Sequence, residues 1–127
     1  MSLQRQHISP GGKPYLVRYF VAGWSPTNRQ TGPAVFLHHF LASDSDDAVH
    51  SHPWGWSASL ILAGGYSEER CTPDGKRVTR EYKPGDVNVI TADDKHRIDL
   101  LRQDCWTLFL AGHFEKAWEF APRCEET

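Results

Sequence analysis

The sequence lacks the features that mark several common classes of protein. Basic residues do not outnumber acidic ones, since 14 Lys and Arg stand against 16 Asp and Glu, and the formal net charge is −2. Such a balance gives no reason to expect a nucleic-acid partner. The longest mainly apolar run covers residues 59–63, far short of the roughly 20 residues that span a bilayer. We therefore expect neither a nucleic-acid-binding protein nor an integral membrane protein.

Cysteine is also scarce, with only Cys71, Cys105 and Cys124 in the chain. An odd number of widely spaced cysteines favours free thiols, and the first seven residues contain no apolar segment that could form the middle of a signal peptide. We therefore expect a cytoplasmic protein. A length of 127 residues is about one domain's worth, so residues 1–127 are expected to form a single domain.

What the sequence does contain is a regular series of short runs rich in Val, Ile, Tyr, Phe and Trp, separated by turn residues. This pattern is typical of strands, and no amphipathic helix intervenes. We expect an all-β sandwich or barrel of about eight strands. The expected strands are residues 15–21, 34–41, 57–62, 66–71, 77–82, 87–91, 96–102 and 105–111, together with a short strand at 49–52 that Pro53 breaks. One or two helical turns are expected at 114–120, because Phe114 and Trp118 stand four residues apart.

The chain has seven histidines, and two of them, His50 and His52, are separated by a single residue. In an extended segment such residues point to the same face, where both imidazoles could bind one ion. A third ligand would come from another strand, and His96, which opens the strand expected at 96–102, is the best candidate. The non-metal interpretation keeps the same histidines as hydrogen-bonding pocket residues.

The spacing around these histidines follows a pattern. After His52, four residues lead to Ser57 and six more lead to Gly64. This segment resembles the first motif of the cupin superfamily, in which Gly, five residues, His-x-His, three or four residues, Glu, six residues and Gly follow one another. Ser57 stands where that motif has its Glu ligand.

The second cupin motif has a counterpart too. Five residues after Gly85 comes Thr91, then Asp93, and two residues further on His96. The family motif reads Gly, five residues, Pro-x-Gly, two residues, His, three residues, Asn, so Thr91, Asp93 and Leu100 replace its Pro, second Gly and Asn. The resemblance covers about residues 34–111, and the segment 49–54 also looks like small uncharacterised cupin-like proteins of bacteria and phages.

The resemblance implies a double-stranded β-helix, the cupin or jelly-roll barrel, with a metal ion inside one mouth. Because Ser57 replaces the Glu, it implies a three-histidine site of His50, His52 and His96, similar to that of the cupin dioxygenases. The cofactor would then be a divalent ion, Fe(II) in the first instance, with Zn, Ni or Mn as alternatives. The substrate would be a small chelating molecule such as a thiol, a diketone or a phenol, and the chain would form a homodimer through an outer strand.

Several further residues are candidates for the site. We expect Tyr66 and Arg80 to be catalytic, Tyr66 through its phenol and Arg80 by anchoring a substrate carboxylate. Arg18 and Arg70 could serve as that anchor instead, and Tyr82 could offer a phenol. Either His38 or His39 could face inward, since both share their phase with apolar residues.

Two other functions remain open from the sequence. One is a metal-independent sugar isomerase or epimerase that uses His96 with Asp93 or Asp99 as base and Tyr66 as acid. The other is a non-catalytic module that binds a small ligand or a metal for sensing.

Overall fold

In the computed structural model, the described residues are 3–24, 32–44, 48–72, 74–113 and 120–122, with the backbone alone described at 48–50 and 120–122. The regular elements are β1 (Arg5–Ile8), the short 3-10 helix η1 (Pro10–Gly12), β2 (Leu16–Ala22), β3 (Ala34–Phe40), β4 (Ala48–His50), β5 (Trp56–Ala63), β6 (Tyr66–Cys71), β7 (Arg77–Tyr82), β8 (Val87–Thr91), β9 (Lys95–Leu100), β10 (Cys105–Ala111) and β11 (Phe120–Pro122). None of the helices in these ranges is long and apolar enough to cross a membrane.

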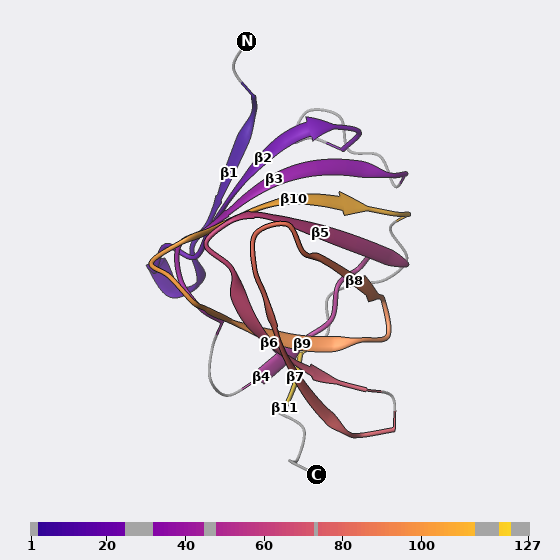
Figure 1. The fold of residues 1–127 in the computed structure, drawn as a ribbon. Coiled ribbons are helices and arrows are strands. Elements are labelled where there is room, and N and C mark those ends of the chain that lie inside the picture. Colours follow the sequence, from indigo (N-terminus) through magenta and orange to yellow (C-terminus); the bar gives the residue numbers. More distant parts are fainter. Residues whose placement is uncertain (1–2, 25–31, 45–47, 73, 114–119, 123–127) are drawn as a thin grey trace.

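The strands form two antiparallel sheets that lie on opposite sides of a common interior (Figure 1). One has the strand order β1-β2-β3-β10-β5-β8 and the other β11-β4-β9-β6-β7. The prediction of an all-β fold is therefore confirmed.

Four predicted strands, now β6, β7, β8 and β10, have the predicted ends. The strand predicted to run to His52 is too long, because β4 stops at His50. Pro53 has no N–H to donate, so the ladder could not continue through it, and the described strand ends three residues before it. The helix predicted at 114–120 lies outside the described residues except for Phe120, which begins β11.

The edge strand β1 was not predicted. Its sequence carries no alternation of apolar and polar side chains, and three of its four residues are exposed. The prediction of free thiols is wrong for Cys71, which is disulfide-bonded, whereas Cys105 is free and buried.

Alternate residues of the strands fill the interior. In β3, for example, Ala34, Phe36, His38 and Phe40 are buried and the residues between them are half-buried. The buried apolar side chains form two clusters. One contains Leu16, Phe40, Ile61, Tyr66, Tyr82, Ile98 and Cys105, and the other contains Phe20, Ala34, Phe36, Trp54, Phe109 and Ala111.

The turn between β5 and β6 depends on Gly64, whose φ of +85° is rarely adopted by other residues. A Cβ added at this position would lie 2.2 Å from the Asp104 carbonyl oxygen, which is too close. Gly75 has a similar φ of +84° but open space around it. We expect Gly75→Ala to lower the free energy of unfolding by about 1 kcal/mol, and Gly64→Ala by about 3 kcal/mol or more. Urea unfolding measures both, and equal losses would contradict this account of the turn.

Candidate functional site

Polar side chains that are almost fully buried cross the barrel interior. They come from both sheets and include Arg18, His38, Ser57, Ser59, Glu68, Asn88, His96 and Thr107. Because a buried polar group is costly unless it is hydrogen-bonded, so many of them in one interior point to a purpose other than stability.

The two histidines His52 and His96 meet at their ring nitrogens. The Nε2 atoms lie 3.1 Å apart, and the rings are nearly perpendicular with centroids 4.8 Å apart. His96 is in β9, whereas His52 is in the segment between β4 and β5, beside Trp54 and Phe109. Both residues belong to the predicted ligand set, and the structure brings their rings together from distant segments of the chain.

Each of these rings has its other nitrogen beside a polar group. His96 Nδ1 lies 2.8 Å from Glu68 Oε2, and since a carboxylate can only accept, Nδ1 carries the proton and donates it. His52 Nδ1 lies 3.4 Å from Ser57 Oγ. Ser57 thus supports His52 from the position where the cupin motif has Glu.

Glu68 is the centre of the network. Its Oε2 also accepts a bond of 2.7 Å from Asn88 Nδ2, and its Oε1 pairs with Arg70 Nε at 3.0 Å. Asn88 donates to the Tyr66 hydroxyl at 3.0 Å and accepts a bond of 2.7 Å from Arg70. Glu68 lies in β6 and Asn88 in β8, so these bonds join the two sheets across the interior.

Electrostatics keep Glu68 ionised. Burial by itself would raise the pKa of this carboxyl, but the hydrogen bond and charge of His96, followed by Asn88 and Arg70, outweigh burial and lower the pKa to about 2. Burial raises the pKa of Tyr66, despite the bond from Asn88, so its phenol is protonated at neutral pH. A fixed anion therefore lies behind His96.

The two Nε2 atoms suit one metal ion. Nitrogens bonded at about 2.1 Å to the same ion, at roughly a right angle, would be about 3 Å apart. A histidine ligand that donates its other ring nitrogen to a carboxylate is the usual arrangement at metal sites. Within the described residues, however, no three His, Cys, Asp or Glu side chains form a group that could hold a metal.

His50, the third predicted ligand, is described by its backbone alone. The ladder between β4 and β9 pairs it directly with His96. The register therefore places His50 on the strand beside one of the two converging histidines.

The two predicted catalytic residues differ in their positions. Tyr66 is buried, and the described hydrogen bonds connect it to His96 through Asn88 and Glu68. Arg80 is exposed on β7, with its guanidinium 4.7 Å from the centre of the Tyr82 ring. Among the residues that the structure describes, no contact joins Arg80 to His52 or His96.

The structure decides which histidine of β3 faces inward. His38 is buried and receives a hydrogen bond of 3.0 Å from Arg18. His39 points outward, where it stacks on Trp106 with a centroid distance of 3.9 Å and pairs with Asp104 at 2.7 Å. Asp99, considered above as a partner of His96, instead binds Arg97.

Sequence reasoning missed Glu68 and Asn88. Glu68 stands in the run Ser67 to Arg70, which shows no apolar alternation, and Asn88 lies between the valines of β8. The signal that was available is phase, because Glu68 shares its face with Tyr66 and Asn88 shares its face with Ile90, and both partners are core residues.

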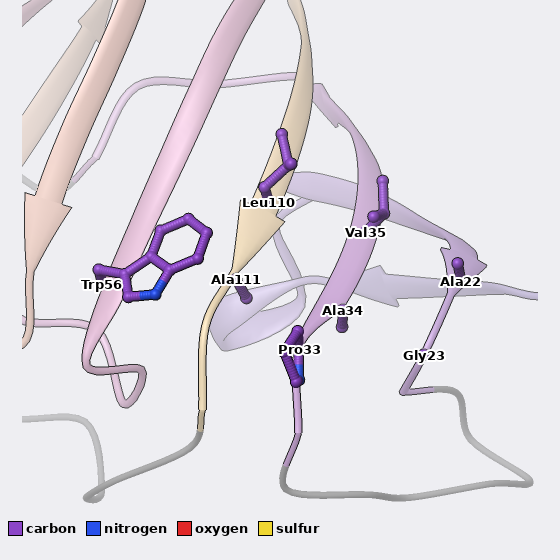
Figure 2. Close-up of a pocket in the computed structure, with 8 residues that line it drawn as sticks. All are labelled: Ala22, Gly23, Pro33, Ala34, Val35, Trp56, Leu110 and Ala111. Carbon is purple, nitrogen blue, oxygen red and sulfur yellow. The ribbon is translucent and has the colours of Figure 1, made fainter.

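A pocket at one end of the larger sheet has a different character (Figure 2). Its lining is Ala22, Gly23, Pro33, Ala34, Val35, Trp56, Leu110 and Ala111. With no ionisable side chain in it, this pocket offers apolar contact only.

Comparison with known proteins supports the fold. No family model matches the chain, and no curated protein sequence does. Among solved structures, Fe(II)-HppE with the alternative substrate (S)-1-HPP has a TM-score of 0.65 at 10% identity, over 87% of this chain and 56% of that one. HppE has also been solved with Co(II).

Two further structures are similar. The DMSP lyase DddQ from Ruegeria pomeroyi has a TM-score of 0.65 at 19% identity, over 92% of this chain and 60% of that one. A Klebsiella pneumoniae protein with a double-stranded β-helix domain has a TM-score of 0.61 at 13% identity, over 86% of both chains. The fold is thus a cupin-like double-stranded β-helix, as predicted, and the chain spans little more than half of HppE.

Substitution of Glu68 tests the network. Glu68→Gln keeps the shape but removes the anion that faces Arg70 and His96, and breaking a buried ion pair in this way should lower the free energy of unfolding by about 3 kcal/mol. The control is Glu81→Gln, at an exposed position of β7. Denaturant unfolding measures both, and a loss below about 1 kcal/mol for Glu68→Gln would contradict a central role.

Proposed function

We propose that the protein is a metal-binding cupin in which His50, His52 and His96 hold one divalent ion, Fe(II) in the first instance. The observation that carries this proposal is the convergence of the His52 and His96 Nε2 atoms, 3.1 Å apart, with a polar group behind each ring. With the His96 Nδ1 proton donated to Glu68 and the His52 Nδ1 proton donated to Ser57 Oγ, both Nε2 lone pairs would be available to one ion.

The residues around the pair have distinct parts in this proposal. Glu68 accepts the Nδ1 proton of His96, which fixes the tautomer and increases the basicity of Nε2. Arg70 and Asn88 hold Glu68 in place. The rings of Trp54 and Phe109 lie 5.9 and 5.7 Å from that of His52 and keep water from this side of the site.

For the reaction we propose an oxidation by O₂ of a small chelating substrate, that is, a dioxygenase. Three neutral nitrogen ligands leave a bound Fe(II) its full charge and open positions for substrate and oxygen. The iron in the similar HppE structure supports the choice of metal. Tyr66, protonated and linked to His96 through Asn88 and Glu68, would hold a proton near the site, while Arg80 stays a candidate for contact with substrate at the surface.

A second candidate uses the same carboxylate without a metal. His96 with Glu68 behind it forms a pair suited to acid–base chemistry, as an isomerase or epimerase requires. This candidate explains the hydrogen bond between Glu68 and His96. It gives no role to the His52 ring, whose Nε2 lies 3.1 Å from that of His96.

Metal binding separates the two candidates. Chelator-treated protein, loaded with Fe(II) without oxygen, should bind about one ion per chain. His52→Ala should weaken Fe(II) binding by more than about 10–100-fold, the loss typical when a residue that hydrogen-bonds to a metal ligand is removed. The matched control is His39→Ala, which removes a histidine on the outer face.

Elemental analysis and calorimetric titration give the stoichiometry and the affinity. Binding that is absent in the wild-type protein, or equal in wild type and His52→Ala, would contradict the metal proposal. Isomerase activity in metal-free protein would support the acid–base candidate instead.

We further propose that the protein is a homodimer that pairs through the outer face of the larger sheet. Exposed apolar residues lie there on the neighbouring strands β5, β8 and β10, namely Trp56, Leu62, Val87, Val89 and Leu110. Trp56 and Leu110 are two of the residues visible in Figure 2. Because β8 is the edge of this sheet, an apolar face beside an open edge favours a second copy as its partner.

Light scattering after size-exclusion chromatography tests the dimer. The wild-type protein should have twice the chain mass, and Val87→Glu with Val89→Glu should have the mass of one chain, since each carboxylate would be buried in the interface. Val78→Glu, at an equally exposed valine of the other sheet, should remain a dimer. A monomeric wild-type protein would contradict the proposal.

A further inference from the structure

A row of three polar residues crosses the inner face of the larger sheet, beside the histidine pair. Arg18 in β2 is paired in register with His38 in β3, which is paired with Thr107 in β10. The exposed fraction of the residue is 7% for Arg18, 3% for His38 and 0% for Thr107. Cross-strand partners point to the same face, so the three side chains are neighbours.

The hydrogen bonds of this row are incomplete. Arg18 Nε donates to His38 Nε2 at 3.0 Å, so the proton of the neutral His38 ring is on Nδ1. Within the described part of the chain, His38 Nδ1 and Thr107 Oγ1 are buried with no hydrogen-bond partner. The described contacts of the Arg18 guanidinium carbon are with aromatic rings, 4.9 Å from the centre of Phe36 and 5.8 Å from that of Trp54.

The charge of Arg18 also has no described partner of opposite charge. The other three buried or half-buried arginines among the described residues have acidic partners, since Arg97 binds Asp99, Arg70 binds Glu68 and Arg77 binds Glu69. No ion pair with a described carboxylate exists for Arg18. Burial lowers its pKa to about 10, which leaves it protonated at neutral pH, and burial together with the Arg18 charge lowers the pKa of His38 well below 6.5.

The row therefore presents one positive charge and, beyond the bond between Arg18 Nε and His38 Nε2, polar groups on His38 and Thr107 that no described partner satisfies. An isolated buried charge is costly, and a bound anion would offset that cost. Because His38 is neutral, the site matches a single negative charge. A carboxylate fits this charge and the planar fork of the guanidinium, whereas a phosphonate dianion would bring one charge too many.

We propose that Arg18, His38 and Thr107 bind the carboxylate of a small-molecule substrate. This inference rests on the proposed function, in which the part of the substrate away from the carboxylate lies at the histidine pair next to this row. Trp54 contacts both the Arg18 guanidinium and the His52 ring, and Phe109 contacts both His38 and His52, with ring distances of 4.7 and 5.7 Å. The substrate class is thus a small monocarboxylic acid with an apolar portion between these rings.

The test is a titration of the metal-free, full-length protein with sodium propionate, followed by NMR of the His38 ring nitrogens and the Thr107 amide. Propionamide serves as the neutral ligand of the same shape, and methylphosphonate as the dianion. Propionate should saturate both signals, and propionamide should bind at least tenfold more weakly.

Two variants assign the binding. Arg18→Met, which keeps an apolar side chain of similar length, should weaken propionate binding at least tenfold, and Thr107→Val, which is nearly isosteric, at least threefold. Arg102→Met removes an exposed arginine that has no part in either proposed site, and this variant should bind as the wild type does. Circular dichroism confirms folding, and Thr107→Val keeps the test valid if Arg18→Met does not fold.

Equal affinity for propionate and propionamide, unchanged affinity in the variants, or tighter binding of methylphosphonate would each overturn the proposal. The outcome is separate from that of the metal proposal. Propionate binding to His52→Ala would support the carboxylate site even if no metal binds, and Fe(II) binding without propionate binding would overturn this inference alone.

Discussion

The ionised carboxylate of Glu68 is the constraint on which the interior of this protein depends. A buried anion must be surrounded by donors, and here they come from three strands, with Arg70 in β6, Asn88 in β8 and His96 in β9. Because β8 belongs to one sheet and β6 and β9 to the other, satisfying this charge also fixes the two sheets against each other. The same bond orients the His96 ring, so stability and the geometry of the site have a common origin.

The barrel interior thus has apolar clusters with a layer of polar side chains among them. This layer has one part around Glu68 and another around Arg18, and the two differ in how completely their hydrogen bonds and charges are paired. Around Glu68, charges and donors match. Around Arg18, the described residues supply a positive charge without an acidic partner, and His38 Nδ1 and Thr107 Oγ1 have no hydrogen-bond partner among them. The network around Glu68, in which every charge has a partner, can hold a reactive centre in place, whereas the unmatched donors around Arg18 are suited to binding a ligand. Trp54 and Phe109 lie between the two and bring them into one site.

The sequence predicted the strands well where turn residues bracket an alternating run, as around Arg77–Tyr82, and poorly at β1, where the run is polar and exposed. The two motifs named His52 and His96 as members of one site, and their rings lie side by side in the structure. Phase could place Glu68 on the inner face beside Tyr66 but could not reveal its role, because that role depends on contact with β8 and β9, which are distant in the sequence. Alternation left His38 and His39 equivalent, and only the neighbouring strands decide which faces inward.

The central claim is that Glu68 holds the His96 Nδ1 proton so that the Nε2 atoms of His96 and His52 face one ion. The most direct measurement is NMR of the histidine ring nitrogens in ¹⁵N-labelled protein during titration with Zn(II), a diamagnetic substitute for Fe(II). The account predicts that both Nε2 signals shift on binding while Nδ1 of His96 keeps its proton. Unchanged Nε2 signals, or loss of the proton from His96 Nδ1 on metal binding, would contradict it.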